Sequence, residues 1–420
     1  MLALVCNNFL NPGSESMPEQ PRLALLLSGG GARAAYQVGV LKAITEFLPP
    51  GSHSPFRIIC GTSAGGINAA GLAIHSDQLG KGIRYLEEIW GNFKTNQVYR
   101  TDLPGVLACA LRFIATLVLG RMGRSQAVSL LDNRPLRQLL HEHLNLNRLQ
   151  EMLDQGHLDA LAITASGYSS GESVSFFQGA PHLEGWQRSR RIGMRTRLDV
   201  EHLMASAAIP IIFPAVRINR EYFGDGAVRQ LAPVSPALHL GADRVLVIGV
   251  GSQMKRKTRE QVSQSPSLAQ VVGHVMASSF VDALEADLER LNRVNHTISL
   301  ISEEVRQNEG FSLKPVQVFS ISPPSQVIET MALRHVTALP ASIRMFVTGS
   351  GATRRSGAGV LSYLLFEAEY CQALIELGYI DATSQKAQLL EFLGGAPQTN
   401  LSPAQPDPDV HQPVVRAGSL

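Results

Sequence analysis

The stretch RIICGTSAGGINAAGL, residues 57–72, has the pattern of a strand, a tight turn and a helix. Its centre, GTSAG at residues 61–65, follows an apolar run and opens a segment of small residues. In a G-x-S-x-G turn the two glycines let the backbone bend sharply and approach its neighbours, so the serine hydroxyl is exposed at the end of a strand. Ser63 is therefore the candidate nucleophile, and an ordinary glycine-rich turn is the alternative for so short a pattern.

A second glycine-rich turn, SGGGAR at residues 28–33, lies between an apolar strand at 23–27 and a helical pattern at 34–47. Free backbone N–H groups and the helix dipole together favour negative charge at such a position. Two functional interpretations compete, a dinucleotide pyrophosphate site and an oxyanion hole for acyl transfer. Both glycine turns follow strands, and ligands of α/β folds bind beyond the carboxyl ends of the strands.

The residues that follow this turn favour the oxyanion hole. A dinucleotide site requires an acidic residue about 20 positions further on, at the end of the second strand, but the nucleophile turn stands there instead. A phosphate-binding P-loop is excluded because no Gly-Lys-Ser/Thr follows the glycines. We therefore expect the N–H groups of Gly30 and Gly31, with that of Ala64, to stabilise the oxygen that becomes negative during acyl transfer.

The candidate base is Asp225, which small residues flank in YFGDGA at residues 222–227. A carboxyl group with the ordinary pKa of about 3.9 is a weak base in water, so it must be desolvated or tightly hydrogen-bonded to the serine. Because Ser63 and Asp225 are far apart in the chain, only the tertiary fold can bring them together. A plain Asp-Gly turn is the alternative interpretation.

Composition excludes several classes of protein. The chain has 420 residues, of which 45% are hydrophobic and 17% charged, and a net charge of +2. It is long enough for a large core, and it lacks the basic footprint of a nucleic-acid-binding protein. Four scattered cysteines without a CxxC pattern argue against a disulfide scaffold or a zinc site and favour a reducing, cytoplasmic location. The first residues lack the basic start of a signal peptide.

The patterns along the chain predict an α/β protein with a largely parallel central sheet. Further apolar runs alternate with helical patterns, and this alternation is typical of βαβ units. The runs lie at 158–165, 173–177 and 245–250, and the helical patterns at 200–207 and 233–240. No internal repeat is present.

Four segments are expected: a flexible N-terminal extension over 1–20, a catalytic domain over 21–253, an α-rich accessory region over 254–393 and a disordered, proline-containing tail over 394–420. A polar stretch at 255–266 marks the linker between the two folded segments. Within the accessory region the patterns predict helices at 267–292 and 361–377 and a strand at 316–321.

Three elements, GGGAR at 29–33, GTSAG at 61–65 and DGA at 225–227, occur in an order that resembles the patatin-like phospholipases, the lipid acyl hydrolases with a Ser-Asp dyad. The resemblance runs from about residue 23 to residue 250. It implies a three-layer α/β sandwich and no metal or organic cofactor. The segment LDNRPL at 131–136 is also similar to a stretch that follows the variable region in these proteins.

The resemblance also implies roles for individual residues. Ser63 matches the nucleophile and Asp225 the partner base. The oxyanion loop corresponds to Gly29, Gly30, Gly31, Ala32 and Arg33, with Ala64 beside it, and the remaining motif positions are Gly61, Gly65, Gly226 and Ala227. The function implied is a serine lipid acyl hydrolase, of the phospholipase A or lysophospholipase type, that acts in lipid catabolism or remodelling.

Two alternatives to the dyad enzyme stay open. A Ser-His-Asp esterase would take its histidine from the residues beyond Asp225, which include His239, His274, His296 and His335. A protein that kept the fold for lipid binding or regulation would need no catalytic groups. The joint presence of a serine, an acid and an oxyanion loop favours the enzyme.

Residues 103–124 are a candidate lid or membrane-contact segment. Residues 103–120 are strongly apolar, but Pro104 and Arg112 interrupt them and they are too short for a spanning helix. A buried core helix and a lid or interfacial helix are the two interpretations. A second basic stretch surrounds Trp186, and Arg33 is a candidate phosphate ligand or a structural ion-pair partner. The expected partner is a lipid or membrane-surface substrate, and the oligomeric state is left open.

Overall fold

A computed structural model describes residues 21–119, 129–252, 265–302, 305, 314–353 and 357–394. The expected extension over 1–20, most of the linker at 255–266 and the tail beyond residue 394 lie outside this part of the chain. Among the described helices, none combines the length and the apolar character needed to cross a membrane.

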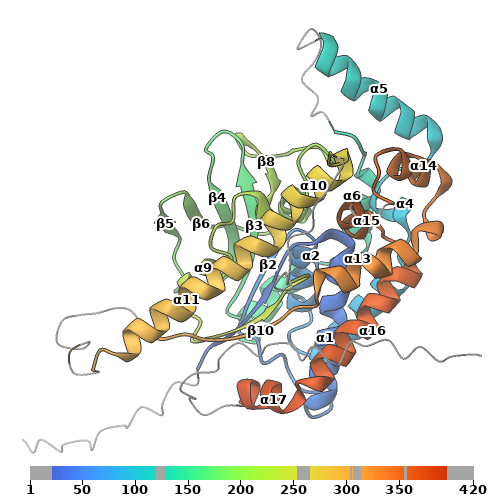
Figure 1. The fold of residues 1–420 in the computed structure, drawn as a ribbon. Coiled ribbons are helices and arrows are strands. Elements are labelled where there is room, and N and C mark those ends of the chain that lie inside the picture. Colours follow the sequence, from blue (N-terminus) through green and yellow to red (C-terminus); the bar gives the residue numbers. More distant parts are fainter. Residues whose placement is uncertain are drawn as a thin grey trace, which may run out of the picture.

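A mixed sheet forms the centre of the molecule (Figure 1), in the order β10-β9-β1-β2-β3-β4-β6-β5. The run from β10 to β3 is parallel, β4 is antiparallel to β3, and β8 pairs with both β3 and β7. The strands are β1 Leu23–Leu27, β2 Ile58–Thr62, β3 Ala160–Gly167, β4 Ser173–Gly179, β5 Trp186–Arg188, β6 Arg191–Arg195, β7 Val216–Ile218, β8 Glu221–Asp225, β9 Arg244–Ile248 and β10 Gln317–Ile321. The largely parallel sheet predicted from the sequence is confirmed.

Helices cover both faces of this sheet, which gives three layers. Leu25 and Leu27 of β1 belong to one hydrophobic core, and Ala24 and Leu26 between them belong to the other. The helices up to residue 252 are α1 Ala35–Phe47, α2 Ala64–Ala73, α3 Leu79–Gly91, α4 Thr95–Val98, α5 Leu103–Leu119, α6 Arg134–His143, α7 Asn147–Asp154, α8 Val200–Ser206 and α9 Ser235–His239. Strands buried on both faces form continuous apolar runs, which is why β1 could be predicted with its observed bounds.

The region after the linker packs on this core and is rich in helix, as predicted. Its strand β10 extends the sheet beside β9. Its helices are α10 Leu268–Ala277, α11 Ala283–Ser299, α13 Ser325–Arg334, α14 Ala341–Gly349, α15 Ala358–Leu364, α16 Ala368–Ser384 and α17 Lys386–Gly394. A π-helical turn, Ser278–Asp282, joins α10 to α11.

One helix prediction in this region is wrong. The pattern at 361–377 predicts a single helix, but α15 ends at Leu364 and α16 begins at Ala368. Phe366, in the break, is buried and its ring lies against those of Trp90 and Phe93. The apolar period continues through the break because residues on both sides face the core, so periodicity alone could not locate it.

Helices α1 and α16 lie against each other without intervening side chains at two glycines. A Cβ atom at Gly39 would lie 1.9 Å from the carbonyl oxygen of Ile375, and one at Gly378 would lie 2.2 Å from that of Tyr36. Both distances are far shorter than van der Waals contact, so these two positions accept only glycine while the helices keep this spacing. Through this contact the C-terminal region is attached to the helix that follows the glycine-rich loop.

We predict that Gly39→Ala lowers the free energy of unfolding by about 1–3 kcal/mol, because the new methyl group must push α16 away. Thermal or urea unfolding followed by circular dichroism measures the change. Gly80→Ala, on α3, is the matched control, since its Cβ would lie 3.4 Å from the flexible side chains of Arg84 and Thr45. The control should be neutral or more stable, and equal loss in both variants would contradict the prediction.

Candidate active site

The sharp turn predicted around Ser63 is present between β2 and α2. Ser63 has φ 55° and ψ −132°, a backbone conformation that side-chain-bearing residues rarely adopt. A Cβ atom at Gly65 would lie 2.4 Å from the carbonyl oxygens of Leu27 and Ser28. The glycine therefore lets the start of α2 press against the end of β1, and the turn places Ser63 at the carboxyl edge of the sheet.

Ser206, at the end of α8, holds this turn in place. The Ser63 N–H group donates to Ser206 Oγ at 2.8 Å, and Ser206 Oγ donates to the carbonyl oxygen of Thr164 at 2.6 Å. The side chain of Ser206 is fully buried. Sequence reasoning missed this residue, because a single serine among alanines carries no pattern of its own.

The register of the sheet brings Asp225 to Ser63. Along β3, Thr164 pairs with Thr62 at the end of β2, and the next residue, Ala165, pairs with Asp225 at the end of β8. Because β4 occupies the other edge of β3 through these residues, β2 and β8 lie on the same edge and meet end to end. The residue that follows Thr62 is Ser63, so the nucleophile and the carboxylate become neighbours.

Asp225 is fully buried, and one of its two carboxyl oxygens has no hydrogen-bond partner in the described chain. Its Oδ1 accepts the N–H group of Ala227 at 2.9 Å, while its Oδ2 has no hydrogen-bond partner among the described residues. Burial raises the pKa of Asp225 to about 7, and the Ser63 hydroxyl and the Ala227 N–H group lower it only in part. The Ser63 hydroxyl is thus close enough to act on the carboxyl group without a well-aligned hydrogen bond, and such bonds often tighten only when substrate binds. Oδ2 is the carboxyl oxygen that remains available as an acceptor.

The glycine-rich loop lies beside Ser63 with free donors. In the described part of the chain, no acceptor is found for the backbone N–H groups of Gly29, Gly30, Gly31 and Ala64. Gly31 has φ 54°, and a Cβ atom there would lie 2.2 Å from the carbonyl oxygen of Tyr363 on α15. Position 31 therefore requires glycine both for its positive φ and for its close approach to Tyr363. Through this contact the C-terminal region holds the loop in place.

Of the two roles considered for Arg33, a structural ion-pair partner and a phosphate ligand, its surroundings favour the first. Its guanidinium group is buried, donates from Nε to Ser362 Oγ at 2.8 Å, and lies 4.0 Å from the ring centre of Tyr363. Glu329 is a second, longer partner at 3.5 Å. These contacts leave the side chain poorly placed for a phosphate group in solution, so the ion-pair interpretation of Arg33 fits the geometry better.

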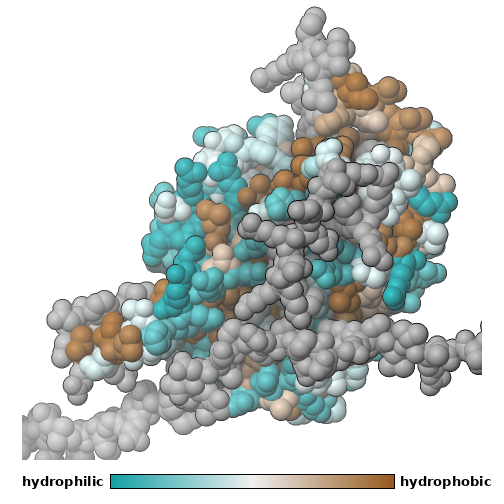
Figure 2. Space-filling model, viewed as in Figure 1, coloured by the Kyte–Doolittle hydropathy of each residue, from teal (hydrophilic) through white to brown (hydrophobic). Residues whose placement is uncertain are grey.

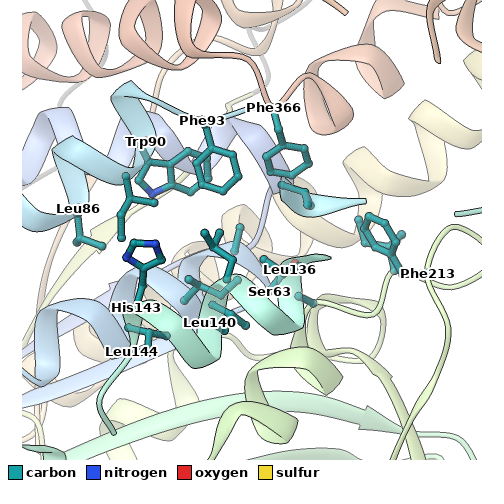
Figure 3. Close-up of a pocket in the computed structure, with 18 of the residues that line it drawn as sticks. Ser63, Leu86, Trp90, Phe93, Leu136, Leu140, His143, Leu144, Phe213 and Phe366 are labelled. Atoms are coloured by element: carbon teal, nitrogen blue, oxygen red, sulfur yellow. The ribbon is translucent and has the colours of Figure 1, made fainter. Parts of the chain in front are cut away.

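An apolar pocket opens from Ser63 (Figure 3). Gly31, Ser63 and Ala64 line it together, and side chains from α3, α6 and the loops around them form the walls. The walls are dominated by large apolar groups, among them Leu86, Trp90, Phe93, Leu140, Phe213 and Phe366. Phe366 comes from the break between α15 and α16, so the pocket uses residues from both ends of the chain.

The remaining sequence candidates lie elsewhere. The four candidate histidines, His239, His274, His296 and His335, are not among the residues that line the pocket; His239, for example, stacks on Trp186. The histidine that does line it is His143 on α6, which precedes Asp225 in the chain. In the described residues no group of three or more His, Cys, Asp or Glu side chains is arranged to hold a metal ion. In the basic stretch around Trp186, Arg195 donates to backbone carbonyls of the β4–β5 connection.

Comparison with known proteins assigns the family. The model of the patatin-like phospholipase family matches residues 25–238, just over half of the chain. The chain belongs to this family. The matched segment includes the glycine-rich loop, the turn at Ser63 and Asp225, which are the three elements that carried the resemblance in sequence. The α/β fold with its central, mostly parallel sheet agrees with this membership.

Three individual proteins that resemble this patatin-like protein share 27% or fewer of their aligned residues with it. The cGAMP-activated phospholipase of Pseudomonas aeruginosa (strain BWHPSA011 / Pa011) is 27% identical over 215 residues, which cover 51% of this chain and 55% of the relative. The chain thus spans about half the length of that curated relative. Human GIVD cytosolic phospholipase A2 aligns in structure with a TM-score of 0.42 at 12% identity, over 89% of this chain and 60% of that chain. VipD from Legionella pneumophila aligns with a TM-score of 0.30 at 13% identity, over 86% and 67%.

The buried carboxyl group of Asp225 predicts a characteristic dependence of stability on pH. Its folded-state pKa of about 7 lies above the ordinary value of 3.8, so the native state binds the extra proton and loses stability as the pH rises between these values. Asp225→Asn removes this loss. From about pH 4 to about pH 8 the variant should gain about 3–4 kcal/mol over the wild type in unfolding free energy. Urea unfolding at several pH values measures it, and parallel curves for the two proteins would contradict the prediction.

Proposed function

We propose that this patatin-like protein is a serine lipid acyl hydrolase that uses Ser63 and Asp225 as a catalytic dyad. The observation that carries the proposal is the combination at one point of a strained, pocket-facing serine and a buried carboxyl group with one unpaired oxygen. Membership of the family supports the reaction class. The pKa of about 7 for Asp225 suits a general base that works near neutral pH.

In the proposed reaction, Ser63 Oγ attacks the carbonyl carbon of a lipid ester while Asp225 Oδ2 takes the hydroxyl proton. The N–H groups of Gly30, Gly31 and Ala64 then stabilise the negative oxygen of the tetrahedral intermediate. As the intermediate collapses, Asp225 returns the proton to the leaving alcohol and an acyl-serine remains. Water releases the fatty acid by the same route, with Asp225 again as base, so no metal or organic cofactor takes part.

The pocket supports a lipid as the substrate. An acyl chain gains free energy by leaving water, about 0.8 kcal/mol for each buried CH₂ group, and the walls between α3 and α6 offer apolar side chains almost throughout. The ester carbonyl would lie at the Ser63 end, with the rest of the lipid outside. A phospholipase A or lysophospholipase activity fits this arrangement.

The assignment of the nucleophile is tested with a fluorophosphonate probe, which labels activated serines covalently. We expect labelling of the wild type and none of Ser63→Ala. Ser76→Ala is the matched control, because Ser76 is also buried but its hydroxyl donates to the carbonyl oxygen of Ala73 on α2, and it should be labelled like the wild type. Labelling that persists in Ser63→Ala would exclude Ser63 as the nucleophile.

The role of Asp225 predicts a pH profile. The base must be ionised, so kcat/KM for a p-nitrophenyl ester should fall by about tenfold per pH unit below about pH 7 and level off above it. Asp225→Asn should lower kcat/KM by about 10²–10⁴-fold. Asp287→Asn is the control, since Asp287 is another buried carboxylate with a raised pKa but accepts the N–H group of Val234. A variant at Asp225 that keeps substantial turnover would move the role of base to another residue, such as His143 in the pocket wall.

A further inference from the structure

Helix α5 exposes apolar side chains on a part of the molecule where nothing in the described chain covers them. It projects from the body of the protein (Figure 1), and Leu103, Leu107, Leu111 and Ile114 are 49–66% exposed. Figure 2 shows a brown region at the upper right, where Figure 1 places α5. A helix with so little polar surface is normally buried in a core or in a membrane, and contiguous apolar patches of this kind mark interaction sites. The buried core helix considered from the sequence is not what the fold contains.

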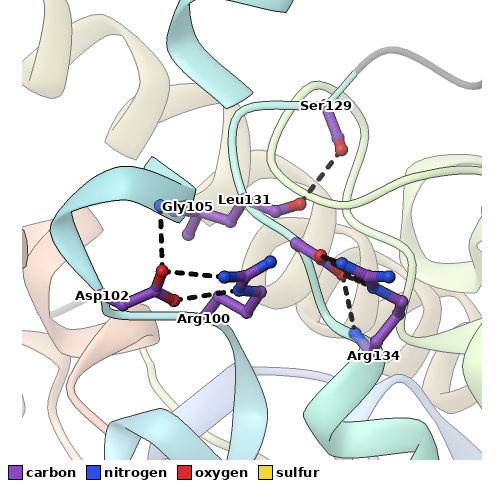
Figure 4. A network of polar contacts seen from close by, with 7 residues as sticks. Arg100, Asp102, Gly105, Ser129, Leu131 and Arg134 are labelled. Carbon is purple, nitrogen blue, oxygen red and sulfur yellow. Dashed lines mark hydrogen bonds and ion pairs between the residues drawn. The ribbon is translucent and has the colours of Figure 1, made fainter. Parts of the chain in front are cut away.

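The base of α5 is fixed by a polar network (Figure 4). Before the helix, Arg100 pairs with Asp102, and Asp102 Oδ2 also accepts the N–H group of Gly105 in the first turn. After it, Arg134 pairs with Asp132, and the Arg100 N–H group donates to the carbonyl oxygen of Asp132 at 2.9 Å. The two segments of chain that lead into and out of α5 are therefore joined side by side, and the helix has an anchored base.

This base adjoins the wall of the active-site pocket. Val98 of α4, just before the network, and Leu136 of α6, just after it, both line the pocket. The N–H group of Leu130 donates to the carbonyl oxygen of Ile211, whose side chain is 61% exposed and whose φ is 72°. A β-branched residue with positive φ is strained, and here the strain accompanies a large apolar side chain presented to solvent near the base of the helix.

The charges of this part of the chain select the partner. Between Asp102 and Asp132 the sequence has three charged residues, Arg112, Arg121 and Arg124, and all are basic. Exposed apolar side chains combined with basic ones are the composition of helices that bind the interface of anionic membranes. A core-forming protein partner would gain nothing from this one-sided charge.

We propose that α5 and Ile211 form a docking surface for an anionic lipid bilayer, with Leu103, Leu107, Leu111 and Ile114 inserted at the boundary between headgroups and acyl chains. The inference rests on the proposed function for its choice of a lipid surface. Docking there places the base of α5, and with it the pocket wall, at the level from which a lipid molecule leaves the bilayer. The surface thus serves delivery of substrate, while the dyad serves its cleavage.

Vesicle binding by the full chain tests the docking surface separately from hydrolysis. The Ser63→Ala chain, which leaves the lipid intact, is sedimented with vesicles of phosphatidylcholine mixed with phosphatidylserine. Adding Leu107→Gln and Leu111→Gln, which remove apolar surface without changing charge, should weaken binding by about tenfold or more. The matched control is Leu300→Gln with Ile380→Gln, at residues 74% and 47% exposed, and it should bind like the Ser63→Ala chain. Leu300 directly follows α11, and Ile380 lies on α16.

With Ser63 present, the same pair of changes in α5 should reduce hydrolysis of vesicle phospholipid by about tenfold more than hydrolysis of soluble p-nitrophenyl butyrate. Unaltered vesicle binding by the α5 variant would overturn the proposal, and equal binding to vesicles of phosphatidylcholine alone would overturn its anionic part. A dimer in analytical ultracentrifugation that the α5 changes dissociate, with vesicle binding retained, would assign the surface to a second copy of the chain. Failure of the hydrolase proposal would instead appear as an inactive wild type that still binds vesicles.

Discussion

Backbone-to-backbone contact at the carboxyl edge of the sheet is the constraint on which the site depends. A Cβ atom at Gly65 would lie 2.4 Å from the Leu27 carbonyl oxygen, and one at Gly226 would lie 2.1 Å from that of Thr164. These absent side chains let α2 press against β1, and let the turn after Asp225 press against β3. The strained conformation of Ser63 persists because the packed elements around it determine it from both sides.

The buried carboxyl group introduces a conflict between stability and function. Full burial of Asp225 raises its pKa to about 7. The same desolvation that would suit the group to its proposed role as a base near neutral pH makes its ionised form costly in the folded state. The Ser63 hydroxyl and the N–H group of Ala227 recover part of this cost. Oδ2 stays unpaired, and a fully satisfied carboxylate would have little tendency to take a proton from Ser63.

The sequence allowed prediction of features that depend on neighbouring residues. The first strand, the helix after the glycine-rich loop and the turn at Ser63 follow from local apolar runs and glycines, and the structure contains each of them. Features that depend on contacts between residues far apart in the chain were missed. Ser206 and Ser362 act through single hydroxyl groups, 143 and 329 residues from their partners, and a lone serine has no periodic signal. The helix break at Phe366 is likewise a tertiary effect, because it places the ring in the pocket wall against Trp90 and Phe93, and the local sequence carries no sign of these contacts.

The C-terminal region is part of the site and cannot be regarded as an accessory to it. The family match ends at residue 238, yet the carbonyl oxygen of Tyr363 forms the wall behind Gly31, and Ser362 accepts the buried guanidinium of Arg33. Glu329, also from this region, is the second acceptor of Arg33. Without Ser362 and Glu329 the guanidinium would be a buried cation with no acceptor, which costs several kcal/mol, and without the Tyr363 carbonyl the glycine-rich loop would lose the surface that fixes its position. The geometry of the glycine-rich loop, and with it the proposed oxyanion site, is therefore set jointly by the family core and by the helices that follow it in this chain.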